Sequence, residues 1–175
     1  MANKVELAGA GGADNSSSAP IYTSNALFGA SASFTPTAAE YTAGDVFGTA
    51  QTFSGIGPTA GGTVRIVSTT LLVAHTALVA SEGAYTLHLF NAALASPIAD
   101  NAAFDVAAAD RTKYLGSLAL GTPVDIGSTL WVEVNSLNKL ITVPSGGAVI
   151  GYLVNAATIT PTAAARTVRL HAVQV

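Results

Sequence analysis

Residues 63–74 read TVRIVSTTLLVA, and this stretch decides the fold class because its side chains alternate with a period of two. Successive side chains of a β-strand point to opposite faces, so Val64, Ile66 and Ser68 are expected on one face and Thr69 on the other. β-Branched residues fill most of the run, as is typical of strands. The stretch therefore predicts a long strand that is only partly apolar on its second face.

Further runs of this kind are separated by Gly, Pro, Asn and Asp. They span residues 85–90, 114–120, 129–134, 140–143, 148–155 and 166–175. Many short strands with turn residues between them indicate an all-β sandwich or barrel, not alternating β and α units. Thr42–Asp45 (TAGD) is predicted to be a turn, and the alanines of Val106–Thr112 favour one or two turns of helix.

The first 40 residues are predicted to be an extended N-terminal arm. Residues 1–20 are rich in Gly and Ser, and such a segment cannot bury enough apolar surface to form a packed core. Ile21–Phe34 (IYTSNALFGASASF) is apolar enough to rest on another surface but irregular, which suits an arm that reaches onto a neighbouring subunit. Residues 41–175 are predicted to be a single β domain.

Charge and hydropathy argue against two classes of partner. The net charge is −3 and the seven Lys and Arg residues are scattered, which disfavours binding to nucleic-acid phosphates. The longest apolar stretch, residues 71–80, is shorter than the ~20 residues that cross a bilayer, and residues 1–18 lack the apolar core of a signal peptide. We therefore expect no nucleic acid and no membrane as partner, and synthesis in the cytoplasm of the producing cell.

The chain carries few charges for its size. Only 10% of its residues are charged, fewer than a freely soluble monomer usually has. One interpretation is that much of the surface is covered by self-assembly or by docking onto a larger body. The alternative is a surface made soluble by Thr and Ser.

No group of residues predicts catalysis or a cofactor. The chain has no Cys, which excludes disulfides, thiolate zinc sites and Cys nucleophiles. Gly9–Asp14 (GAGGAD) lacks the preceding strand and the following helix that a phosphate loop needs. His75, His88 and His171 lie in separate strand-like runs, so surface or interface positions are expected for them rather than a metal triad.

Asp100, Asp105 and Asp110 recur every five residues without the spacing of an EF-hand loop. The preferred interpretation places Asp100 and Asn101 in a turn and lets Asp110 cap or close a short helical segment. A calcium site stays open as the alternative.

The chain has one Trp, in the run LWVEVN at residues 130–135. Alternation places Trp131 on the face of Glu133, opposite Leu130 and Val132. A single Trp in a β protein is more often packing or interface material, whereas an exposed one would suit a sugar-binding platform.

Three segments carry a family resemblance: YTAGDVFGTAQTF (41–53), YTLHLFNAALASPIADNAAFDVAAADRTKYLG (85–116) and VIGYLVNAATITPTAAARTVRLHAVQV (149–175). Their motifs are a Y-x-x-G-D start, a strand ending in L-x-L-F, a loop with P…D-N-x-x-F…D…Y-L-G and a late G-x-L-V strand. In this order they resemble the head decoration, or cement, proteins of tailed bacteriophages. The resemblance covers residue 41 onward.

The resemblance implies a jelly-roll-like β-sandwich, commonly trimeric, that lies over the joints between capsomers and ties them together through an arm. It implies no catalysis. The predicted protein is therefore a non-enzymatic component of the outer capsid surface of the virion, with the major capsid protein and further copies of itself, as a homotrimer, for partners. The predicted interface residues lie on the arm and on the loop 97–110: Ile21, Tyr22, Leu27, Phe28, Phe34, Pro97, Ile98 and Phe104.

Two other functions stay open. A carbohydrate- or receptor-binding module of a phage tail or fibre would use Trp131 and Tyr85 as stacking groups. A hydrolase on a jelly-roll scaffold is the third hypothesis, although no paired acids, metal cluster or nucleophile motif points to it.

Overall fold

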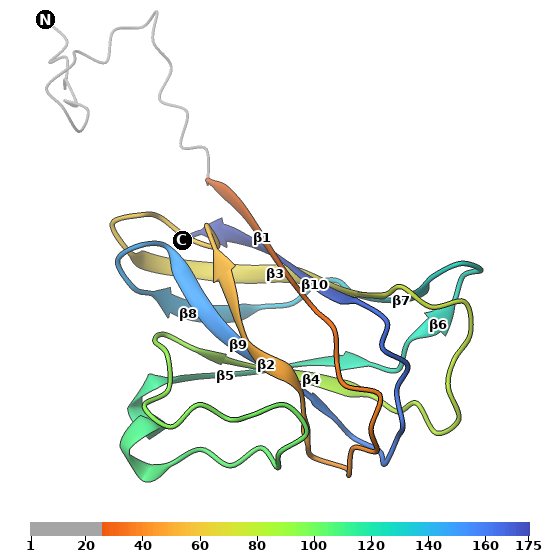
Figure 1. Cartoon of the computed structure of the whole chain (residues 1–175). Helices are drawn as coiled ribbons and strands as arrows, with labels where there is room; N and C mark the ends of the chain where they lie inside the picture. The colour runs from red at the N-terminus through yellow and green to blue at the C-terminus, as the bar shows by residue number, and fades with distance from the viewer. Residues whose placement is uncertain (1–25) are drawn as a thin grey trace, which may run out of the picture.

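The computed structural model describes residues 26–175, and they form two antiparallel sheets that face each other as a sandwich (Figure 1). The strands are β1 (Leu27–Phe34), β2 (Val46–Ser54), β3 (Gly62–Val73), β4 (Tyr85–Phe90), β5 (Tyr114–Gly121), β6 (Val124–Asp125), β7 (Leu130–Val134), β8 (Lys139–Val143), β9 (Ala148–Asn155) and β10 (Arg166–Gln174), with the 3₁₀ helix η1 (Ala108–Lys113) before β5. The prediction of an all-β sandwich is confirmed.

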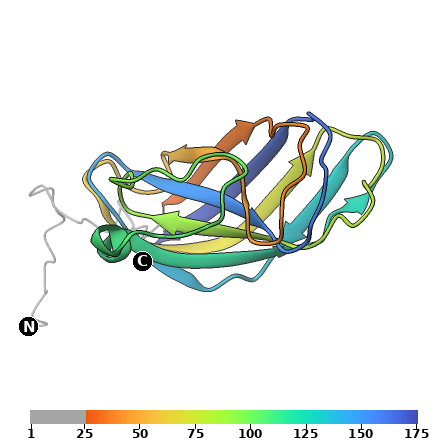
Figure 2. The same ribbon diagram turned by 60° about the horizontal axis from the view of Figure 1, so that its bottom comes forward.

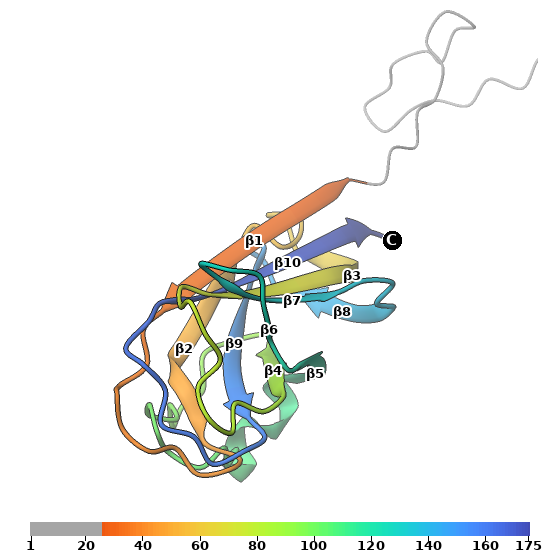
Figure 3. The ribbon, with the colours of Figure 1, turned by 90° about the vertical axis from the view of Figure 1, so that its right-hand side faces the viewer.

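One sheet has six strands and the other has four. The six-stranded sheet runs β1-β10-β3-β7-β6, with β8 also paired to β3, and the four-stranded sheet runs β2-β9-β4-β5. Figure 3 shows β1 at the edge of the six-stranded sheet with β10 beside it. This order leaves each sheet with one face toward the other sheet and one outer face.

The core lies between the sheets and follows from alternation along the strands. On β10, Val168, Leu170 and Ala172 are buried, while Arg169 and His171 between them are exposed. The core strands alternate in this way because one face packs on the other sheet and one is solvated.

The alternation of inward and outward side chains along β3 reverses in the middle of the strand. A constant period of two did not predict this reversal. Val64 and Ile66 point into the core, but Thr69 also points inward and is fully buried, whereas it was expected on the opposite face. The cause is a register shift against β10 between His171 and Ala172, since an extra residue in one strand of a pair reverses the alternation beyond it. The Thr69 hydroxyl is satisfied by donating to the Arg169 carbonyl at 2.9 Å.

β1 lies inside the segment that composition assigned to the arm. It pairs with β10 along its whole length, from Leu27 to Phe34. Five of its eight residues, LFGASASF, are Gly, Ala or Ser, so the strand depends on its neighbour more than on local propensity. The predicted arm residues Ile21 and Tyr22 lie outside the described residues.

The turn at Thr42–Asp45 is present. Gly44 takes a positive φ of 93°, and the Asp45 carboxylate accepts bonds of 2.7 Å from both the backbone and the hydroxyl of Thr42. The predicted helix at Val106–Thr112 is realised as η1. Within residues 26–175, no helix has the length and apolar character needed to cross a bilayer.

Candidate interface surfaces

The outer face of the four-stranded sheet is covered by the chain itself. Figure 2 shows the segment 91–113 lying across this face. Phe90 and Tyr152 project outward from β4 and β9 and are buried under Leu94 and Ile98 of the segment, which forms a second apolar cluster outside the main core. We call this surface the covered face.

Asp110 holds the covering segment in place. Its buried carboxylate accepts bonds from the backbone amides of Ala95 at 3.0 Å and Ser96 at 3.3 Å and pairs with Lys113 at 2.8 Å. The amide of Ala95 and the ammonium of Lys113 hold the pKa of this carboxyl below its usual value. Asp110 therefore ties two parts of the segment together, whereas the N-cap of η1 is Ala107, without a side-chain bond.

An aromatic cavity opens at the end of the covered face. It has a volume of about 270 Å³ and is lined by Phe104, Val106, Arg111 and Tyr114. His88 stacks on Phe104 with 4.0 Å between ring centroids, and its Nδ1 lies 3.0 Å from the Tyr114 hydroxyl. Burial lowers the pKa of His88, so the ring favours its neutral form.

The predicted interface residues of the loop have different positions. Pro97 is exposed, Phe104 is half-buried against His88, and Ile98 is buried in the second apolar cluster. Ile98 thus packs within the chain and offers almost no surface to a partner.

The outer face of the six-stranded sheet is different, because no segment of residues 26–175 crosses it in Figures 1 and 3. We call it the open face. Cross-strand neighbours on it are mostly small or polar, as in the row Ser31, Arg169, Thr70 and Glu133 across β1, β10, β3 and β7.

The predicted interface residues of β1 lie at the edge of this sheet. Leu27 is 81% exposed, whereas Phe28 and Phe34 are half-buried and pack against the main core. The ring of Phe34 lies so close to Gly48 of β2 that a Cβ there would be 2.5 Å from it. The structure therefore places Leu27 and Phe34 at opposite ends of β1 and separates both from Ile98 and Phe104, which pack on the four-stranded sheet.

The two aromatic residues of the sugar-binding hypothesis lie in different environments. Trp131 points to the open face between Leu72 and Val124, half-buried, on the side predicted from its run. Tyr85 is 1% exposed and packs on Phe47 inside the core, so it cannot stack on a ligand.

A buried polar cluster at the rim of the core was not predicted from the sequence. Arg166 and Glu82 are both almost fully buried and lie 3.8 Å apart, and the Tyr85 hydroxyl donates to Glu82 at 2.8 Å. The guanidinium of Arg166 also lies 5.1 Å from the centre of the Phe47 ring. Burial raises the pKa of Tyr85, so its hydroxyl stays protonated. The closed position and paired groups make this a structural cluster.

The candidate metal ligands do not converge. Asp100 accepts bonds from the Tyr41 hydroxyl at 2.6 Å and the Gly48 amide at 2.7 Å, while Asp110 has the partners given above. Among residues 26–175, no three His, Asp or Glu side chains lie close enough to hold a metal ion together. The histidines are also apart, since His88 lies on the covered face and His171 on the open face.

Comparison with known proteins gives weak matches only. No protein-family model matches the chain, and no curated protein matches it. A chain of the structure "Cyanophage Pam1 capsid asymmetric unit" is 16% identical, with 86% of this chain and 84% of that chain covered and a TM-score of 0.34. The PRD1 vertex protein P5 is 13% identical, with coverages of 85% and 96% and a TM-score of 0.32. These weak structural neighbours are a phage capsid and a virus vertex protein, and membership of the decoration family stays a prediction.

Proposed function

We propose that the chain is a non-enzymatic virion protein that decorates the outside of a tailed-phage capsid and holds neighbouring capsomers together. The observation that carries this proposal is the exposed apolar groups at both ends of the six-stranded sheet. Leu27, Leu140 and Val175 lie at one end, Val124 and Ile126 at the other, and each is at least 53% exposed.

Several weak contacts suit this role. Exposed apolar groups that share one face mark interaction sites more often than scattered ones do. Between them the open face has small polar residues, so one copy would bind weakly. A symmetric oligomer engages several copies at once, and its avidity then exceeds the affinity of each contact. The homotrimer belongs to the proposal for this reason.

The direct test compares virions assembled with and without the chain. We expect virions from a genome with this reading frame deleted to release DNA at a lower temperature, and the purified full-length protein to bind them and restore the release temperature. Deletion virions that keep the same heat resistance and do not co-sediment with added protein would overturn the proposal.

The mass in solution tests the oligomer separately. Light scattering coupled to size exclusion should give the mass of three chains, each of 17.4 kDa. A protein that stays a monomer both free and on the particle would contradict bridging by a trimer.

One observation favours a second candidate function, a glycan- or receptor-binding module of a tail or fibre. Trp131 lies on the open face with an apolar neighbour on each side. A glycan array would detect such binding, and Trp131→Ala should abolish it. Of the two predicted stacking residues, only Trp131 keeps exposed surface, because Tyr85 is buried.

A further inference from the structure

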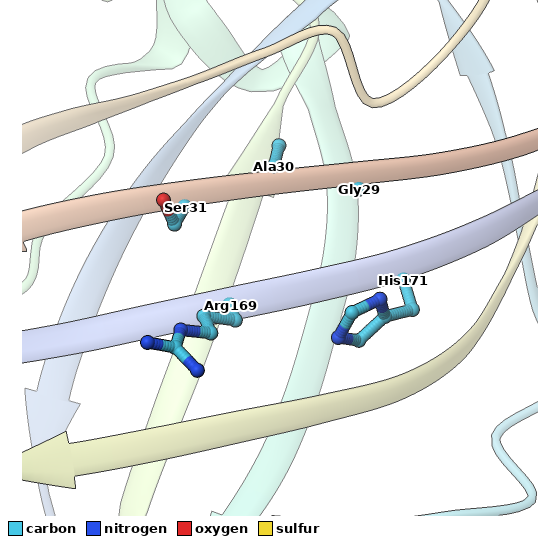
Figure 4. Close-up of a pocket in the computed structure, with 5 residues that line it drawn as sticks. All are labelled: Gly29, Ala30, Ser31, Arg169 and His171. Carbon is cyan, nitrogen blue, oxygen red and sulfur yellow. The ribbon is translucent and has the colours of Figure 1, made fainter.

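A shallow groove lies on the open face between β1 and β10 (Figure 4). Its volume is about 190 Å³, and it is lined by Gly29, Ala30, Ser31, Arg169 and His171. The side chains of Arg169 and His171 project from β10 and that of Ser31 from β1 on the viewed side. Gly29 and Ser31 lie opposite His171 and Arg169, so small residues separate both basic side chains from the sheet edge.

The charge around the groove has the opposite sign to that of the chain. On the open face, β1, β10 and β3 carry Arg65, Arg169 and His171 and no acidic residue, and the acidic residue in the row of Arg169 is Glu133, two strands away on β7. This part of the surface therefore complements a partner rich in carboxylates.

Arg169 is available for such a partner. Arg166 pairs with Glu82 and Lys113 with Asp110, but no carboxylate of residues 26–175 lies within 4.0 Å of the Arg169 guanidinium. An exposed arginine presents a planar fork of donors that matches a carboxylate.

Thr70 gives a second, independent observation. It lies opposite Arg169 on one side and Glu133 on the other, it is only 7% exposed, and its Oγ1 has no hydrogen-bond partner among residues 26–175. A buried hydroxyl without a partner is unfavourable. The row of Arg169 therefore contains a buried polar group that residues 26–175 leave unsatisfied.

β1 supplies the other half of the site. Among residues 26–175 it is hydrogen-bonded to β10 alone, so no described strand pairs with its outer edge, and its residues LFGASASF include no charge and no proline. Natural edge strands usually carry charges, prolines or bulges that prevent pairing with another chain. An uncharged edge of eight residues is suited to strand addition.

We propose that β1 binds an extended acidic segment of a partner polypeptide by strand addition, with alternate carboxylates of that segment paired to Arg169 and His171 across Ser31 and Gly29. Strands in a sheet lie about 4.8 Å apart, so the added strand would lie about 10 Å from β10. An arginine and a glutamate side chain together span this separation when the residue between them is small. This inference deepens the proposed function by giving the chemistry of the capsid partner.

The first test uses the full-length protein and two labelled peptides of eight residues, one alternating glutamate with valine and the other lysine with valine. Fluorescence anisotropy should show binding of the acidic peptide at least tenfold tighter than binding of the basic one. Equal binding of both peptides, or of neither, would overturn the proposal. If two copies pair through β1 and exclude the peptide, binding is lost as the protein concentration rises, and that result overturns it as well.

Arg169→Gln tests the groove, with Arg111→Gln as the matched control. Both arginines are exposed, but Arg111 lies at the cavity of the covered face. We expect Arg169→Gln to weaken binding of the acidic peptide at least tenfold and Arg111→Gln to change it less than twofold. Equal effects of the two variants would show general charge attraction and contradict the site.

A separate experiment tests strand addition by modifying the peptide and using the wild-type protein. Methylation of every second backbone amide blocks hydrogen bonding along one edge of the peptide and leaves the other edge free. Of the two acidic peptides methylated in alternate registers, one should bind as before and the other should lose binding. If both bind as before, the peptide does not add to β1.

The same variants separate this inference from the proposed function. If Arg169→Gln loses the peptide but binds deletion virions with unchanged affinity, the site is not the capsid contact, and the inference fails while decoration stands. If the wild-type protein binds the acidic peptide but not the virions, decoration fails and the peptide site stands.

Discussion

The two outer faces of the sandwich differ in their side chains and in whether another segment of the chain covers them. The covered face has large apolar side chains such as Phe90 and Tyr152, and the segment 91–113 buries them. The open face has Ser31, Thr70 and Arg169 at its centre and apolar groups only at its ends. The covered face therefore belongs to the fold, while the open face presents a strand edge, a few charges and exposed apolar groups at its two ends.

The largest effect should separate the faces by stability. Phe90→Ala removes a fully buried ring under the covering segment and should cost about 3–5 kcal/mol of unfolding free energy. Leu72→Ala, at a half-buried position of the open face, should cost less than about 1.5 kcal/mol. Urea unfolding of both variants measures the two losses, and equal losses would contradict the distinction between the faces.

The second prediction concerns the corner where β1 of the open face meets β2. Gly48 has a φ of 76°, and an added Cβ would lie 2.5 Å from the Phe34 ring. Gly48→Ala should therefore cost about 1–3 kcal/mol, and hydrogen exchange should rise most in β1.

Gly44→Ala is the matched control for this prediction. Gly44 also has a positive φ, of 93°, but nothing lies within 4 Å of its added Cβ, so backbone strain acts there without a clash. It should leave exchange in β1 unchanged. Faster exchange in β1 in both variants would mean that the Phe34 contact does not hold β1.

The sequence predicts the central strands better than the edge strands β1 and β2. Alternation in YTLHLF and in RTVRLHAVQV places the central strands, because their neighbours in the core impose the period of two. β1 and β2 carry Gly, Ala and Ser instead, so their pairing with β10 and β9 comes from long-range contacts that local patterns do not record. The change of phase within β3 has the same origin, since a bulge is a property of two strands.

The candidate site shows the same limit. Ile98 and Phe104 read as exposed loop residues, yet they cover Phe90 and Tyr152, whose outward position depends on which face of β4 and β9 meets the core. The groove combines Gly29 and Ser31 with Arg169 and His171, which are about 140 positions apart in the sequence. Only the pairing of β1 with β10 brings them together.

The third prediction concerns the loss of unfolding free energy on acidification through two groups of the covered face, His88 and Asp110. The pKa of His88 is lowered from 6.5 by burial, so the folded protein binds this proton less readily than the unfolded chain. Its contribution to stability is complete above pH 6.5 and is lost as the pH falls through the lowered pKa.

The pKa of Asp110 is also lowered, from 3.8, so its contribution is lost in turn below that pH. We expect two successive decreases in unfolding free energy on acidification, both smaller than the loss in Phe90→Ala. His88→Phe should remove the first decrease and keep the second. An unchanged pH profile in His88→Phe would show that His88 does not couple protons to folding.

The smallest change in stability is expected for the open face, where it is also the most informative. Leu140→Ser replaces a side chain that is 54% exposed, so the unfolding free energy should change by less than about 0.5 kcal/mol. The same substitution removes one of the apolar groups at the end of the six-stranded sheet, and it should weaken binding to deletion virions or reduce the mass seen by light scattering. Leu78→Ser is the control, since Leu78 is 45% exposed and belongs to the loop between β3 and β4, not to any of the six strands. If assembly responds to Leu78→Ser and not to Leu140→Ser, the contact surface lies outside the open face, and the two faces then differ only in how they fold.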